Sequence, residues 1–114
     1  MSNNLRKCLN KMKHYCNTDC KNLKKSMLHE MSSDDKYFNA ILEIITNVSL
    51  KNIAIPVKEK NKLKKHIKVF NKIMIKPKNK KIRKKLIKQS GGAWPILIPF
   101  AIEAVRELIE YVGR

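Results

Sequence analysis

The sequence predicts an all-α fold: a small bundle of about four to five short helices, with a Lys-rich helical segment and a C-terminal amphipathic helix after a Gly-Gly hinge. Apolar residues recur at helical spacing along most of the 114 residues, and no stretch shows the period of two that marks a strand. The hydrophobic content of 43% is close to the globular average, which favours a packed core. We expect one small domain, divided into segments 1–56, 57–90 and 91–114.

The N-terminal helical region, 1–56, is predicted to contain three helices. The first carries apolar residues at helical spacing, at Leu5, Cys8, Met12 and Tyr15 or Cys16. The second, which Asn17 or Thr18 would cap, carries Cys20, Leu23, Met27 and Met31. The small polar and acidic residues at 32–35 mark the start of the third helix. Its buried stripe is expected to be Phe38, Ile41, Ile44, Ile45 and Val48.

The Lys-rich basic segment, 57–90, follows a break at Pro56, which disfavours helix at the preceding residue. Its first helix ends at Pro77 and has a thin apolar side, formed by Leu63, Ile67, Phe70 and Ile73 or Met74. A short basic helix over 79–88 follows, with Ile82 and Leu86 facing inward, and Gly91 and Gly92 break it. Because like charges one turn apart destabilise a helix, we expect the first of these helices to need the core, a polyanion, or both.

Positive charge is concentrated between Lys58 and Lys88. This stretch holds fifteen Lys or Arg and one acid, a net charge of +14 out of +17 for the chain. Such a block is typical of nucleic-acid binding, and its lysines suit phosphate contacts without sequence choice. It does not distinguish DNA from RNA, and an anionic lipid surface or a solvated face without a partner are the alternatives. The expected phosphate-contacting residues are Lys58, Lys60, Lys62, Lys64, Lys65, Lys68, Lys72, Lys76, Lys78, Lys80, Lys81, Arg83, Lys84, Lys85 and Lys88.

The C-terminal tail, 91–114, begins with an uncharged apolar run and continues as an amphipathic helix. Pro99 is suited to a first helical turn, so we expect the helix to restart there. The run is too short for a membrane span, which needs about 20 apolar residues. Two arrangements fit the pattern: a helix docked onto the core, or a face for lipid or a partner protein. The expected apolar face is Trp94, Ile98, Ile102, Val105, Leu108, Ile109 and Val112.

We find no residue pattern that predicts catalysis. The glycines stand at 91, 92 and 113, so a glycine-rich phosphate loop is excluded. The three histidines lie among lysines, where a surface role is the usual one. The three cysteines do not follow a standard zinc spacing, and we expect reduced, partly buried thiols. The sequence therefore predicts neither an enzyme, nor a cofactor, nor a metal site.

The junction between the basic segment and the tail resembles a viral family. A polybasic stretch is followed by Gly91-Gly92, a run rich in Pro, Leu and Ile, and a helix-compatible tail, an order similar to the precursor of adenovirus core protein mu (protein X). The sequence Ser90-Gly91-Gly92-Ala93 resembles the cleavage junction before the membrane-lytic helix of adenovirus minor capsid protein VI. Residues from about 28 to 105 are similar to proteins of Polinton/Maverick elements and adintoviruses, which share a leading helix, a Lys-rich stretch and a Gly-Gly junction.

The resemblance implies a virion-associated core or minor capsid protein that condenses packaged DNA. It implies location in the virion, and in the host nucleus or cytoplasm during assembly. Its partners would be nucleic acid, expected to be double-stranded DNA, together with a capsid protein or a membrane at the tail. An adenain-like protease would cut at the candidate processing site Gly91, Gly92 and Ala93, although Gln89 stands where that family prefers an aliphatic residue. The alternatives are a membrane-active minor capsid protein whose tail is released or exposed on entry, and a cellular ribosome or chromatin protein.

Overall fold

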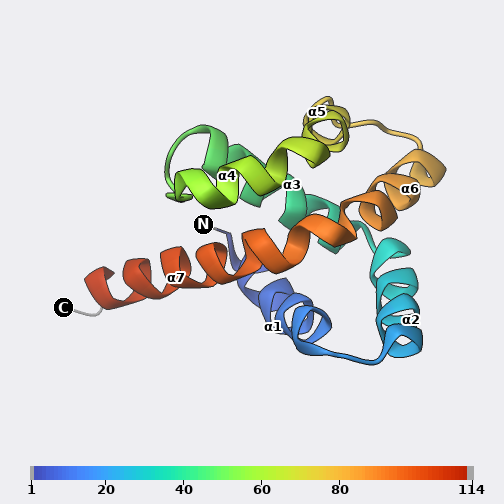
Figure 1. Ribbon diagram of the computed structural model, residues 1–114, viewed down its shortest axis with the longest axis horizontal. Helices are drawn as coiled ribbons and strands as arrows, with labels where there is room; N and C mark the ends of the chain where they lie inside the picture. The colour runs from blue at the N-terminus through green and yellow to red at the C-terminus, as the bar shows by residue number, and fades with distance from the viewer. Residues whose placement is uncertain (1, 113–114) are drawn as a thin grey trace.

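The computed structural model describes residues 2–112, and the side chains of residues 2–106. Over this range the fold is all-helical without strands, which confirms the predicted small helical bundle (Figure 1). The helices are α1 (Asn3–Asn17), α2 (Lys21–Ser32), α3 (Asp35–Ser49), α4 (Val57–Leu63), α5 (Ile67–Met74), α6 (Lys80–Ser90) and α7 (Trp94–Val112). Two 3-10 turns, η1 (Lys64–His66) and η2 (Gly91–Ala93), join α4 to α5 and α6 to α7 without an intervening loop.

Side-chain caps begin several of the helices. Asp34 caps α3, as the acidic start signal predicts, and its carboxylate accepts from the amide of Lys36 at 2.9 Å. Asn79 caps α6 in the same way and accepts from the amide of Lys81 at 2.8 Å. The predicted cap of α2 is wrong, because its N-cap is Cys20. Thr18 instead ends α1, since its hydroxyl donates back to a carbonyl one turn earlier.

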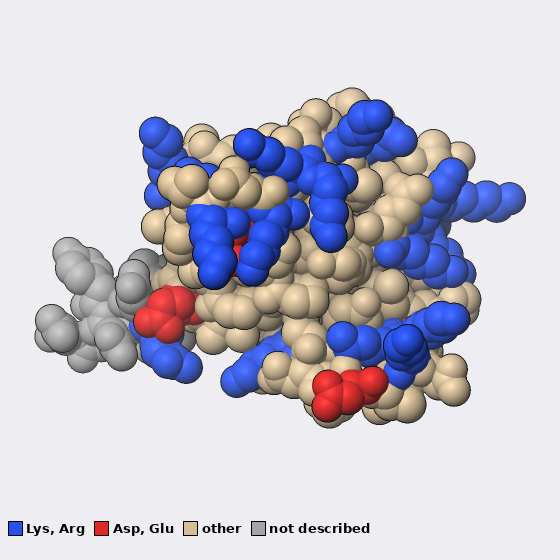
Figure 2. Space-filling model, in the orientation of Figure 1, with Lys and Arg blue, Asp and Glu red and all other residues tan. Residues whose placement is uncertain are grey.

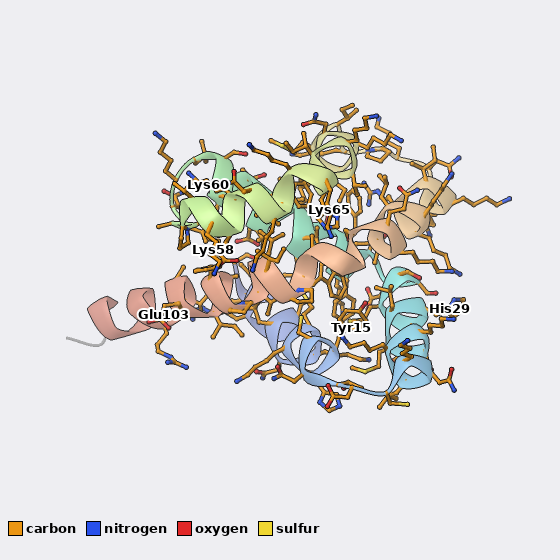
Figure 3. The ribbon with its side chains drawn as sticks, viewed as in Figure 1. Tyr15, His29, Lys58, Lys60, Lys65 and Glu103 are labelled. Carbon is orange, nitrogen blue, oxygen red and sulfur yellow. The ribbon has the colours of Figure 1, made fainter. Side chains whose placement is uncertain are left out.

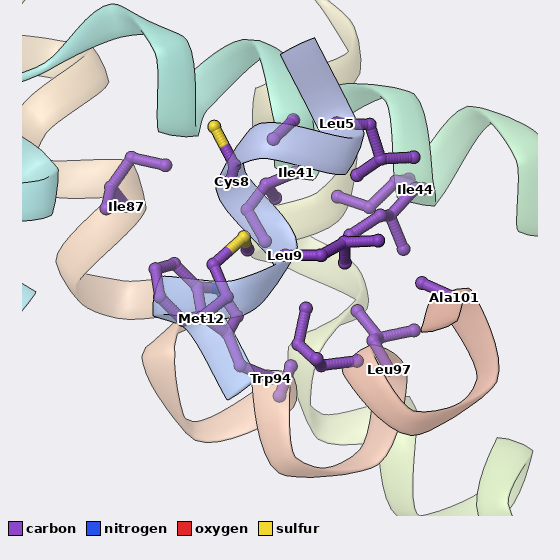
Figure 4. Packing of buried hydrophobic residues seen from close by; sticks show 14 of the residues in the cluster. Leu5, Cys8, Leu9, Met12, Ile41, Ile44, Ile87, Trp94, Leu97 and Ala101 are labelled. Carbon is purple, nitrogen blue, oxygen red and sulfur yellow. The ribbon is translucent and has the colours of Figure 1, made fainter. Parts of the chain in front are cut away.

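The core forms where α1, α3 and α7 meet (Figures 1 and 4). Four residues of the stripe predicted on α3 are buried, and Val48 at its end is half-buried. One apolar cluster unites side chains from all three segments of the chain; examples are Leu5, Met12, Phe38, Ile73, Leu86, Trp94 and Leu97. The tail thus completes the core of the N-terminal helices.

Besides Cys20, the exposed N-cap of α2, three residues of the predicted apolar stripes are exposed: Leu23, Ile67 and Ile82, at 46%, 48% and 47%. Each lies on a helix that buries only a narrow face. On α6 the buried apolar pair is Leu86 and Ile87, at the end of the helix nearest η2. Periodicity alone could not locate these faces, because they depend on where neighbouring helices cross.

The α-helix α6 ends at Ser90, where Gly91 and Gly92 were expected to break it, but the chain forms the 3-10 turn η2 there and no open loop. Gly91 has helical backbone angles, φ −54° and ψ −35°, and neither glycine has a positive φ. The restart expected at Pro99 is wrong, since α7 begins at Trp94 and continues through Pro99. The physical reason is a close approach of other side chains. A Cβ on Gly91 would lie 3.0 Å from Tyr15 Oη and from Leu28 Cδ2, so glycine permits this packing.

Candidate nucleic-acid interface

The predicted phosphate-contacting residues lie on two helical segments and in the connection between them. The first segment, the α4–η1–α5 rod, consists of three consecutive helical elements, and the second is α6. All of these residues are exposed except Arg83 and Lys84, which are half-buried. Figure 2 shows lysine and arginine side chains distributed over the visible face of the molecule, with few acidic side chains among them. The basic segment is therefore folded as helices whose charged sides remain in solvent.

On α6, four lysines form a row. Lys81, Lys84, Lys85 and Lys88 recur at i, i+3, i+4 and i+7, so they share one side of the helix. Together with Gln89 they line an open hollow of about 410 Å³. None of them takes part in the ion pairs found among the described side chains. This row concentrates positive charge that the fold itself does not neutralise.

Helix α2 extends this basic surface, which sequence reasoning missed. Lys25, Leu28 and His29 of α2 line a second hollow, of about 370 Å³, together with Lys88 of α6. His29 is labelled on α2 in Figure 3, on the side of the bundle where α2 approaches α6. Lys25 lies outside the segment 57–90, so the density of charge along the chain could not identify it. In the sequence, the one indication that α2 carries a basic side is the cluster Lys21, Lys24 and Lys25.

Arg83 differs from the lysines beside it, because its guanidinium turns into the bundle. It lies 3.8 Å from the carboxylate of Asp35 and 4.8 Å from the ring centroid of Phe38. Its Nε also donates to the carbonyl of Pro77 at 2.5 Å. These contacts hold α6 against the start of α3, so we do not count Arg83 among the outward phosphate-facing groups.

The α4–η1–α5 rod presents a more dispersed set of lysines, of which Figure 3 labels Lys58, Lys60 and Lys65. Its charge is partly compensated, because Lys62 lies 3.4 Å from Glu59, the one acid of the basic segment. An apolar groove of about 190 Å³ also opens beside this rod, between α3, α5 and α7. The rod therefore combines charge with apolar packing, whereas α6 presents an uninterrupted basic row.

The candidate processing site lies inside the packing of the bundle. Gly91 and Ala93 are buried, and Gly92 is exposed. The imidazole of His66 lies close to Gly92: a Cβ added to this glycine would be 3.3 Å from His66 Cε1. The Nε2 atom of His66 is buried and has no hydrogen-bond partner among the described side chains. Burial and the neighbouring charge of Lys65 lower the pKa of His66 below its usual range.

The apolar face of the tail is docked against the bundle over the residues whose side chains are described. Trp94, Ile98 and Val105 are buried, and Ile102 is half-buried. Trp94 meets the ring of Tyr15 edge-on, with 5.2 Å between centroids. Leu108, Ile109 and Val112, also expected on this face, lie outside the described side chains. Within residues 2–112, none of the helices has the length and apolar character needed to cross a bilayer.

The three thiols are free and lie at different depths: Cys8 is buried, Cys16 half-buried and Cys20 exposed. Burial raises the pKa of Cys16 to about 11 and also raises the pKa of Cys8. Neither thiol is thus poised as a nucleophile at neutral pH. Among the described residues, no three His, Cys, Asp or Glu side chains converge as metal ligands would.

Comparisons with protein-family models, curated protein sequences and solved structures found no match to this chain.

Proposed function

We propose that this chain is a non-enzymatic protein that binds the phosphate backbone of nucleic acid without sequence choice and so condenses DNA. The observation that carries the proposal is the row Lys81, Lys84, Lys85 and Lys88, which lines one hollow and has no acidic partner among the described side chains. Like charges at i,i+3 and i,i+4 destabilise a helix by a few tenths of a kcal/mol per pair, roughly. A bound polyanion would remove this repulsion.

The residue types favour phosphate contact over base reading. The cationic residues of the basic segment are all lysine except Arg83, and lysine is a flexible point charge, whereas specific base contacts favour Arg, Asn or Gln. Its one aromatic residue, Phe70, is half-buried beside His66 and offers no stacking platform for single-stranded bases. Exposed lysines on both the α4–η1–α5 rod and α6 would let one molecule contact more than one segment of duplex, which is what condensation requires.

We place this activity in a virion, as that of a core or minor capsid protein, on the resemblance alone. Cleavage after Gly92 belongs to the same proposal. In the folded chain Gly91, Ala93 and Trp94 are buried, so a protease would need η2 to open before it could cut. A capsid or protease gene beside this one would support the viral context, and a ribosomal or chromatin context would contradict it.

Binding to random-sequence duplex DNA across a salt series tests the proposal. If about ten phosphates are engaged, log K should fall with log salt with a slope of roughly −9. Two duplexes of unrelated sequence should bind equally, and light scattering should rise at protein excess as duplexes are bridged. A flat salt dependence, or no binding at low salt, would overturn the proposal.

A further inference from the structure

We infer that α2 and α6 together form one duplex-binding face, to which Lys25 and His29 contribute from outside the Lys-rich segment. This inference rests on the proposed function and identifies the surface that carries it. Two adjoining hollows define the face: one is lined by Lys81, Lys84, Lys85, Lys88 and Gln89, the other by Lys25, Leu28, His29 and Lys88. Lys88 belongs to both, so the two hollows form one continuous basic surface.

The dimensions of the face suit a run of phosphates. From Lys81 to Lys88 the row extends about 10 Å along the helix axis, at about 1.5 Å per residue. Duplex DNA carries one charge per about 1.7 Å of its axis, so several phosphates fall within that length. Lys25 then adds a cation from α2 in the hollow that it lines together with Lys88.

The face is preorganised by the core beneath it. Met27 and Met31 of α2 and Leu86 and Ile87 of α6 are buried, which holds the two helices side by side. Leu28 approaches Gly91, so the second hollow has an apolar floor fixed to the end of α6. The positions of the lysine backbones are therefore set before any ligand binds.

Neighbouring acids are engaged away from this face. Glu30, next to His29, binds Lys11 of α1 at 2.5 Å, and Asp35 pairs with the inward Arg83. The acid of α2 thus contacts α1, while Lys25 and His29 lie on the side that meets α6. By contrast, Glu59 partly neutralises the α4–η1–α5 rod. A net positive field therefore persists where α2 and α6 meet.

The same face is less suited to a lipid surface. An interfacial helix inserts a continuous apolar side, whereas on α6 Leu86 and Ile87 are buried in the core and Ile82 is the one exposed large apolar residue. Phosphates of a duplex need only the charged side. We therefore commit to duplex nucleic acid as the partner, and anionic vesicles become an arm of the test.

The experiment compares two exposed lysines outside the basic segment in the full chain. Lys25→Gln removes a charge from the α2–α6 face, and Lys13→Gln removes one from the groove between α1 and α7. Lys88→Gln serves as the reference within the row. Duplex DNA affinity is measured across a salt series, and binding to phosphatidylserine vesicles is measured alongside.

Lys25→Gln and Lys88→Gln should each reduce the salt slope by about one and weaken binding roughly eightfold near about 0.1 M salt. Lys13→Gln should change the slope by much less. Equal losses from Lys25→Gln and Lys13→Gln would overturn the composite face while leaving DNA binding by the chain intact. A loss for Lys25→Gln on vesicles alone would also overturn it. Failure of the unmodified chain to bind duplex would overturn the proposed function itself.

Discussion

The hydroxyl of Tyr15 lies against the backbone of Gly91, at a point where a Cβ on that glycine would be only 3.0 Å from the oxygen. Tyr15 belongs to α1 and also meets Trp94 edge-on, so both its hydroxyl and its ring contact the start of the tail. The first glycine of the pair is therefore a crossing point of α1 and the α6–η2–α7 rod. Glycine is needed here because it lets Tyr15 approach the backbone closely, and not because it can adopt a positive φ, which it does not do at this position.

Gly91→Ala should destabilise the fold. Alanine favours helix over glycine by about 1 kcal/mol, but overpacking a fixed core costs about 1–3 kcal/mol. We expect a net loss of about 1 kcal/mol in unfolding free energy, measured by denaturant titration. The matched control is Gly92→Ala, where the nearest atom, His66 Cε1, would lie at 3.3 Å and the backbone is exposed. A loss at Gly92 equal to or larger than that at Gly91 would contradict this account.

Ser90→Ala should destabilise the junction between α6 and α7. The buried Ser90 hydroxyl donates to the carbonyl of Ile87 at 2.8 Å and accepts from Trp94 Nε1 at 3.1 Å. Removing it leaves a buried indole N–H without an acceptor, which costs about 1–3 kcal/mol. Thermal unfolding followed by tryptophan fluorescence measures the effect. An exposed serine, Ser26→Ala, is the control, and an equal change in the two variants would argue against the hydrogen bond.

Arg83 and Lys84 are adjacent but should separate stability from binding. Arg83→Ala removes the contacts with Asp35, Phe38 and Pro77, and should lower the unfolding free energy by about 1–2 kcal/mol. Lys84→Ala should leave stability nearly unchanged and reduce the salt slope of DNA binding by about one. Chemical denaturation and DNA titration on both variants make the comparison. If Arg83→Ala reduced the salt slope and left stability unchanged, the guanidinium of Arg83 would point to the DNA and not into the bundle.

His66 should make stability depend on pH. Its pKa is lowered in the fold by burial and by Lys65, so the unfolded chain binds a proton more readily than the folded one. Stability should be unaffected above the unfolded pKa of about 6.5 and should fall as pH drops through that value toward the folded pKa. His66→Gln should reduce this loss between neutral and mildly acidic pH. His14→Gln, at an exposed site, should leave it unchanged, and identical pH profiles for all three proteins would exclude the effect.

Lys51 occupies a position that suits glycine. It has φ 63° just after α3, where the amide of Asn52 donates to the carbonyl of Asn47 at 2.8 Å in a left-handed cap. Lys51→Gly should therefore raise the unfolding free energy by about 0.5–1 kcal/mol. Lys51→Ala, which keeps a Cβ, is the control and should raise the unfolding free energy by less than Lys51→Gly does. No gain from glycine over alanine would mean that this backbone strain does not limit stability.

Several features were predictable because they depend on local sequence. The stripe on α3 follows from a strong helical period after an acidic cap, and four of its five residues are buried. The exposed lysines follow from composition, since a charged row cannot enter a small core. The inward turn of Arg83 was not predictable, because its partners Asp35 and Phe38 lie far away in the chain.

The sequence by itself determined the all-α class, the core stripe of α3 and the location of the positive charge, since periodicity and composition express these directly. Only the tertiary structure decided that Gly91 and Gly92 form a tight 3-10 turn between α6 and α7, that the tail completes the core, and that Lys25 lines a hollow with Lys88 of α6. The physical reason is that each outcome depends on which distant helices cross. Tyr15, Leu28 and His66 approach the glycines only after the chain has folded.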